Sequence, residues 1–141
     1  MYNPSRDQAR QFLIDAWHKR RQATPATPLE TLAADLIDLH PEYHALLEAA
    51  NALTNEWTPE DGETNPFLHL SLHLAIEEQL AINQPIGIAL LFNQLLSRLG
   101  DRHAALHAVL DCLGETMWCA QRDAQPLDSN AYLDCLRRAA G

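Results

Sequence analysis

Three pairs of histidines, each with a spacing of four residues, are the part of this sequence best suited to chemistry. In a helix this spacing places two side chains on the same face, one above the other. Two of the pairs are followed by a carboxylate at the same spacing, and imidazole with carboxylate is a ligand set for first-row divalent metals. The pairs are His40 with His44, His69 with His73 and His103 with His107, and the two carboxylates are Glu77 and Asp111.

The second pair lies within an apolar helical arc. On a helical projection His69 and Glu77 fall about 40° to either side of His73, and Leu70 and Ile76 fall in the same sector. A buried imidazole or carboxylate needs a polar partner, because an unpaired polar group costs about 1 to 3 kcal/mol in the core. A metal ion would satisfy several of these groups at once.

The third pair shows the same pattern. His103 and Asp111 fall about 40° to either side of His107, and Leu110 and Trp118 share their sector, so we expect this sector and Trp118 to face the core. The helices that carry the second and third pairs are separated by one helix with short connections, so they are expected to run parallel. This arrangement would bring the two pairs to one level.

The first pair gives a weaker signal. Pro41 follows His40, so His40 stands at a junction between helices, and only His44 is expected to be firmly helical. We therefore favour His44 over His40 as a ligand. Because His69 and Glu77 are about 12 Å apart along a helix axis, a single ion cannot bind every candidate, and we expect one or two ions.

Helical periodicity and helix-ending residues predict a chain of helices. Proline and glycine separate the periodic segments, and Asn65, Asp101 and Asp128 are suited to N-caps, with Gly100 as a left-handed C-terminal residue. Residues 54–65 are expected to form the longest loop. We predict an all-α fold, a helical bundle of four main helices plus shorter helices, as a single domain over residues 1–141. The expected helices span about 5–21, 29–39, 41–53, 66–83, 85–99, 101–123 and 129–138.

Composition and charge exclude several classes of protein. The chain has 141 residues, of which 47% are hydrophobic, and this is enough for a real core. Its formal net charge of −9 argues against binding to nucleic acid or to an anionic membrane. We find neither an apolar run long enough to cross a bilayer nor a secretion signal, so a cytoplasmic location is expected.

Three cysteines occur without a Cys-x-x-Cys motif. Their odd number and their spacing indicate neither a disulfide framework nor a thiolate zinc site. We expect Cys112, Cys119 and Cys135 to act as small buried hydrophobic residues.

Four stretches of the sequence carry a family resemblance that covers nearly the whole chain. These stretches are MYNPSRDQARQFLIDAW, HPEYHALLE, TPEDGETNPFLHLSLHLAIEEQLAINQPIGI and HAVLDCLGETMWCAQR. They resemble a bacterial family of unknown function, number 1841 in the series of domains of unknown function. The resemblance implies a bacterial cytoplasmic setting and supplies no catalytic residues.

The sequence supports two hypotheses about function. The first is a metal-binding bundle with a site for one or two transition metal ions, iron or zinc by ligand type, with manganese and nickel open and oxygen or redox chemistry a further option. The second is a metal-free interaction module whose histidines are packed or sense pH. The pattern does not decide whether the chain is an enzyme, and a homodimer is the default assembly. The candidate ligands are His44, His69, His73, Glu77, His103, His107 and Asp111.

Overall fold

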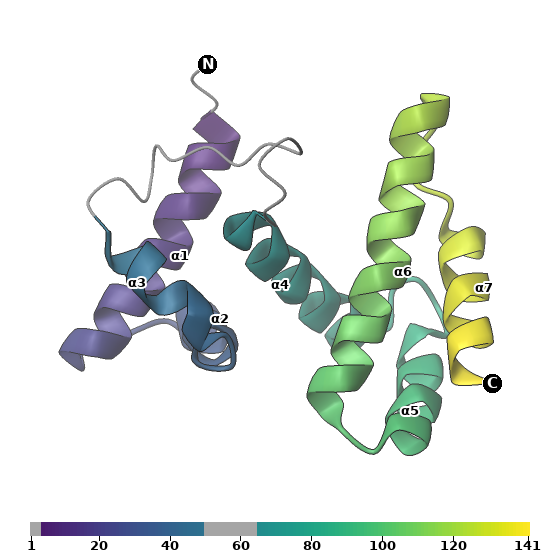
Figure 1. Cartoon of the computed structure of the whole chain (residues 1–141), viewed down its shortest axis with the longest axis horizontal. Helices are drawn as coiled ribbons and strands as arrows, with labels where there is room; N and C mark the ends of the chain where they lie inside the picture. Colours follow the sequence, from purple (N-terminus) through teal and green to yellow (C-terminus); the bar gives the residue numbers. More distant parts are fainter. Residues whose placement is uncertain (1–3, 50–64) are drawn as a thin grey trace. The chain divides into compact units, whose positions relative to one another are not determined.

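The computed structural model describes residues 4–49 and 65–141 (Figure 1). Within these residues it contains seven α-helices, one short 3-10 helix and no strand, which confirms the predicted all-α fold. The chain forms two compact units, residues 1–74 (unit 1) and residues 75–141 (unit 2). The long helix α4 (Pro66–Ile82) contributes to both units. The prediction of a single domain stays a prediction, and residues 54–64 of the predicted loop lie outside the described residues.

Unit 1 is built on two helices that pack against each other, α1 (Pro4–Gln22) and α2 (Pro28–Asp38), followed by short helical turns. On α1, Leu13 and Trp17 are almost completely buried. They pack with residues of α2 and with the first turns of α4. The hydrophobic core of unit 1 contains Leu13, Ile14, Ala16, Trp17, Ala33, Ile37, Leu47, Phe67 and Leu70.

A capping box fixes the start of α2. The Glu30 backbone N–H donates to Oγ1 of Thr27, and the Thr27 backbone N–H donates to Oε1 of Glu30. The Lys19 ammonium donates to Oε2 of Glu30 at 2.7 Å, and this bond holds the pKa of the Glu30 carboxyl below its ordinary value. The spacing Thr-x-x-Glu is the sequence signal for such a cap, and it ties α2 to the end of α1.

The segment after α2 differs from the prediction of one helix over 41–53. The structure has a 3-10 turn, η1 (Pro41–Tyr43), and then a short helix, α3 (His44–Glu48). Proline lacks the N–H that would continue α2 and restricts the residue before it to an extended backbone, so α2 ends ahead of it. His40 has φ −126° and ψ 67°, and its side chain therefore leaves the chain at a corner.

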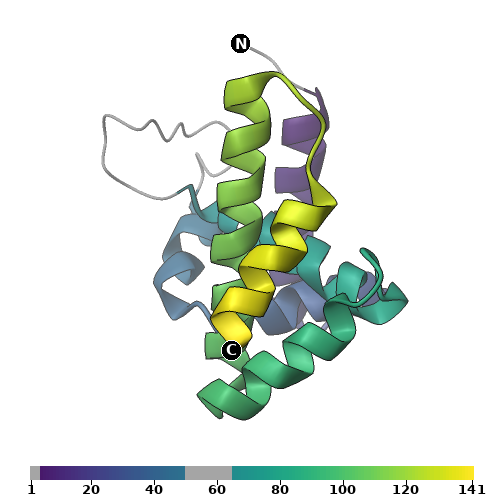
Figure 2. The same cartoon turned by 90° about the vertical axis from the view of Figure 1, so that its right-hand side faces the viewer.

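Unit 2 contains three mutually packed helices, α5 (Ile88–Leu99), α6 (Arg102–Asp123) and α7 (Ser129–Ala140). Figure 2 shows α7 passing obliquely in front of α6 and running beside α5. The predicted helix ends are confirmed, since Gly100 has φ +74° and the side chains of Asp101 and Asp128 accept backbone N–H bonds. The residues buried between these helices include Ile88, Leu91, Leu95, Leu106, Val109, Leu113, Tyr132 and Leu136.

The start of α5 lies three residues after the predicted start at Pro85. Gly87 has φ +101°, which is outside the helical region, so the helix begins only at Ile88. Oδ1 of Asn83 accepts bonds from the backbone N–H groups of Gly87 and Ala89 and satisfies the beginning of the helix.

Two predictions about unit 2 were wrong. Cys112 and Cys135 form a disulfide between α6 and α7, 23 residues apart in sequence, and only Cys119 is free. No local spacing signals this pairing, because packing of two helices brings the thiols together. Trp118, expected in the core, is 59% exposed, with the Arg122 guanidinium over its ring at 4.9 Å.

None of the described helices is both long enough and apolar enough to cross a membrane. The cytoplasmic location stays a prediction.

Candidate metal site

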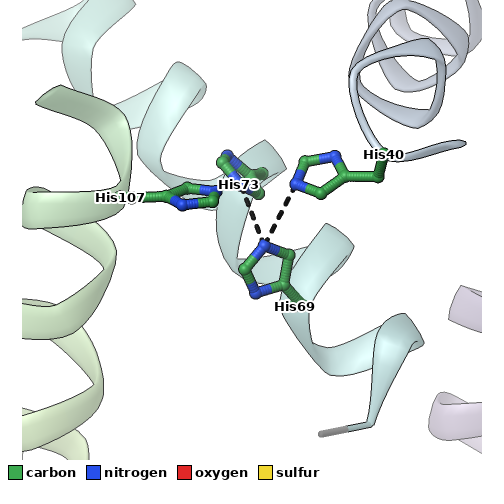
Figure 3. Close-up of side chains that lie close together, drawn as sticks. All are labelled: His40, His69, His73 and His107. Atoms are coloured by element: carbon green, nitrogen blue, oxygen red, sulfur yellow. Dashed lines mark hydrogen bonds between the residues drawn. The ribbon is translucent and has the colours of Figure 1, made fainter. Parts of the chain in front are cut away.

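Three imidazoles converge in unit 1. Nε2 of His69 lies 3.1 Å from Nε2 of His40 and 3.2 Å from Nε2 of His73. One ring nitrogen from each of the three residues lies within 4.8 Å of the others. Figure 3 shows the three rings turned toward one another, with dashed lines for the two short contacts. We call these residues the three-histidine cluster.

His40 is held in the cluster by a bond to the preceding helix, α2. Its Nδ1 lies 2.7 Å from the carbonyl oxygen of Leu36, and because a carbonyl only accepts, Nδ1 carries the proton. In the neutral ring the other nitrogen, Nε2, is then an acceptor, and it faces Nε2 of His69 at 3.1 Å. A hydrogen bond of this kind to the distal ring nitrogen is a regular feature of histidines that bind metals.

His69 and His73 stand one turn apart at the start of α4. Oδ1 of Asn65 accepts bonds from the backbone N–H groups of Phe67 and Leu68, which confirms the predicted cap and fixes where the helix begins. His73 is fully buried, as are Leu70 and Ile76, so this part of the predicted polar stripe lies in an apolar arc.

Tyr43 packs against the cluster from η1. Its ring stacks on His40 with centroids 5.4 Å apart and an interplanar angle of 3°, and it meets His69 edge-on at 6.0 Å. Burial, with a smaller effect of Glu42, raises the pKa of the Tyr43 phenol. The stack helps to orient the His40 ring toward His69.

The distances in the cluster suit a metal ion. Ligands on a tetrahedron with metal–nitrogen bonds of about 2.0 to 2.1 Å lie about 3.3 Å apart, and neighbouring ligands on an octahedron lie about 3.0 Å apart. The measured 3.1 Å and 3.2 Å fall between these two values. Two of the three nitrogen–nitrogen distances are therefore those of neighbouring ligands on one ion, and the third pair of nitrogens lies within 4.8 Å.

His44, which the sequence favoured over His40, has a different place. Its Nε2 lies 2.9 Å from the carbonyl oxygen of Ile37 and carries the proton of that bond. Its ring packs on Trp17 with centroids 4.3 Å apart. His44 is not among the histidines whose ring nitrogens converge, so it supports the corner between α2 and α3 while His40 joins the cluster. The reason is the proline junction, which turns His40 inward.

Glu77 has an ionic partner in unit 2. The two Glu77 oxygens accept bonds of 2.8 and 3.0 Å from the Arg102 guanidinium, which also lies over the Phe92 ring. This bidentate pair links the second half of α4 to the start of α6 and gives the carboxylate a structural role.

The third histidine pair lies on α6 in unit 2. The rings of His103 and His107 are 4.2 Å apart between centroids, as their spacing predicts, and both side chains are half-buried. Asp111 is exposed. The face of α6 that contacts α5 and α7 is a neighbouring one, with Leu106 and Val109 at its centre. The expected meeting of this pair with the pair on α4 concerns both units and stays a prediction.

The sequence of this chain matches one known protein family. The model described as a domain of unknown function, DUF1841, matches residues 5–138. The chain belongs to this family. This result confirms the resemblance seen in the sequence. Searches of curated proteins and of solved structures gave no significant match. Support for metal binding therefore comes from the geometry of the three-histidine cluster.

Proposed function

We propose that this protein binds a first-row transition metal ion, zinc or iron, through the Nε2 atoms of His40, His69 and His73. The observation that carries the proposal is the double contact of His69 Nε2, at 3.1 Å and 3.2 Å, with the other two rings. Imidazole is a preferred ligand of both metals, and manganese and nickel are weaker candidates by ligand type.

A metal explains this double contact better than hydrogen bonds do. A ring nitrogen carries at most one proton, so His69 Nε2 can donate to only one of its two neighbours. His40 Nε2 is an acceptor, because its partner nitrogen donates to Leu36. A cation, in contrast, accepts a lone pair from all three rings at once.

Three imidazoles leave at least one position of a tetrahedral ion for another ligand. An ion of this kind supplies Lewis-acid chemistry to a bound water or to a substrate oxygen. The sequence predicts His103 and His107 as further ligands, with His44, Glu77 and Asp111 completing or orienting the shell. The bonds of His44 to Ile37 and of Glu77 to Arg102 favour a supporting role for these two residues. The variant His107→Ala tests this prediction, because loss of a true ligand weakens binding whereas loss of a packed ring leaves affinity nearly unchanged.

The decisive experiment is elemental analysis of protein purified without an affinity tag. We expect about one zinc or iron per chain, and we expect this metal to be lost in His73→Ala. Cobalt substitution gives a second readout, since the visible spectrum of bound Co²⁺ reports the number and geometry of nitrogen ligands. Metal-free protein that takes up no added zinc or iron contradicts the proposal.

The close approach of the three rings also supports the alternative of a metal-free, pH-sensing interaction module. Protonation of two neighbouring rings would place two positive charges within the distances given above, which disfavours the folded state in acid. If the alternative holds, the melting temperature falls on acidification and is insensitive to zinc or iron. Homodimer formation and the absence of nucleic-acid binding stay predictions.

A further inference from the structure

A cavity in unit 2 gives access to the disulfide. The cavity has a volume of about 450 Å³ and lies between the second half of α6, the following loop and α7. Two cysteines and several charged side chains line the cavity. The residues that matter here are Cys119, Cys135, Glu115, Asp123, Asp128 and Arg138.

The two sulfurs of the disulfide are unequally accessible. Cys112 is 4% exposed on the buried face of α6, whereas Cys135 is half-buried and lines the cavity. A nucleophile that enters the cavity therefore reaches the sulfur of Cys135, and Cys112 is the leaving group. Cys119 lies two helical turns after Cys112 and is not part of the bond.

The packing of α7 does not depend on the disulfide alone. Tyr132 and Leu136 are fully buried, and the Tyr132 hydroxyl donates to Oε1 of Gln79 at 2.8 Å. Arg98 on α5 also donates to the backbone carbonyl of Ala139. With these contacts in place, the bond can open while α7 stays folded against α5 and α6.

We propose that the Cys112–Cys135 disulfide is a reversible redox site that exchanges with a low-molecular-weight thiol through this cavity. A thiolate attacks Sγ of Cys135, the bond to Cys112 breaks, and the electron pair leaves with the Cys112 sulfur, which takes up a proton. A second thiolate attacks the external sulfur of the mixed disulfide and releases Cys135. In sum, two thiols are oxidised to one disulfide, and the protein gains two thiols.

The charge of the cavity indicates the class of thiol. Three carboxylates and one guanidinium line it, and the whole chain has a net charge of −9. Arg122 partly neutralises Asp123, since its Nε lies 3.0 Å from Oδ1 of that carboxylate. This ion pair does not include Glu115 or Asp128. An anionic thiol is repelled by this surface, so a thiol whose reactive thiolate carries no net charge, such as cysteamine with its ammonium group, is the better substrate.

The experiment follows reduction of the full-length protein carrying Cys119→Ser, which removes the free thiol. The protein is treated under native conditions with cysteamine or with glutathione, and intact-mass spectrometry measures each species over time. We expect a mixed disulfide located at Cys135 by peptide mapping, and a helical circular dichroism signal that is retained after reduction. We also expect the glutathione rate to rise about fivefold from low to high ionic strength, and the cysteamine rate to change little.

Charge variants separate the role of the cavity from general repulsion. Glu115→Gln should raise the rate of the reaction with glutathione and reduce the dependence of that rate on ionic strength. Glu78 is an exposed carboxylate on α4, outside the cavity, so Glu78→Gln should change neither quantity. Three outcomes overturn the proposal: a bond that resists thiols until denaturant is added, thiolation at Cys112, or loss of helical signal on reduction. Because the cysteines and the three-histidine cluster are different residues, a failure of metal binding does not affect this test.

Discussion

Nε2 of His40 and Nε2 of His69 lie 3.1 Å apart, although 29 residues separate them in the sequence. His40 comes from the corner after α2, and His69 comes from the first turn of α4 (Figure 3). The contact brings ring nitrogens from two segments together in unit 1, and neither a single helix nor a single pair of histidines would supply three converging nitrogens.

His40→Ala should weaken metal binding by about 100-fold or more, since it removes one of three donors. His44→Ala is the matched control, as it lies four residues away on the same segment and its Nε2 donates to the Ile37 carbonyl. We expect its affinity to stay within about threefold of the wild type. Competition with a chromophoric chelator measures both. Equal losses in the two variants would show that the effect comes from folding of the corner and not from ligation.

Metal binding should release protons and weaken on acidification. Each bound imidazole must be neutral, so protons compete with the ion over the pH range in which imidazole titrates, around pH 6.5 for an unperturbed ring. Calorimetry in buffers with different ionisation enthalpies counts the protons released. A binding constant that does not change from pH 8 to about pH 5.5 would exclude imidazole ligands.

Glu77→Gln should leave metal affinity unchanged, because its carboxylate binds the Arg102 guanidinium. The free energy of unfolding should fall by about 0.5 kcal/mol, since Arg102 is largely exposed and water screens the pair. Arg102→Gln should give a similar small loss. A tenfold drop in metal affinity in Glu77→Gln alone would restore Glu77 as a ligand.

Thr27→Ala should lower the free energy of unfolding by about 1 kcal/mol through loss of the cap of α2. Glu30→Gln keeps the capping box but loses the charge that pairs with Lys19. Because the pKa of Glu30 is lowered in the folded state, the contribution of its charge is present above the ordinary carboxyl pKa near 4.5 and is lost as the pH falls through the lower folded value. Denaturation of wild type and Glu30→Gln should therefore show a difference in stability at neutral pH that disappears in strong acid.

Removal of the disulfide in the double variant Cys112→Ala, Cys135→Ala should lower the free energy of unfolding by about 3 kcal/mol, as expected for closure of a loop of this length. The cross-link joins residues 23 apart and restricts the unfolded chain. Urea denaturation followed by circular dichroism measures the change, with Cys119→Ala as the control for loss of a thiol. A change below about 0.5 kcal/mol would show that the bond does not hold α6 and α7 together.

Local signals in the sequence predicted most of the helices. The caps at Asn65, Asp101 and Asp128 and the end at Gly100 depend on a few neighbouring residues, so they are readable without a structure. The position of His73 between Leu70 and Ile76 was readable for the same reason, because one helical turn brings them together. Local rules were insufficient at Gly87, where the φ value depends on the turn before α5.

Which face of a helix is buried could not be predicted from local signals. On α6 two neighbouring arcs have similar apolar content, one with Leu110 and Trp118 and the other with Leu106 and Val109. Packing against α5 and α7 buries the second arc and leaves Trp118 and Asp111 exposed. The same packing joins Cys112 to Cys135.

The sequence by itself determined that the chain is helical, where most helices begin and end, and that histidines four residues apart share a face, because these properties follow from backbone geometry and near neighbours. Only the tertiary structure decided that His40, and not His44, meets His69 and His73, since the proline corner sets the direction of one ring relative to a helix far along the chain. Contacts of this kind depend on how separate segments pack, and no local pattern encodes them.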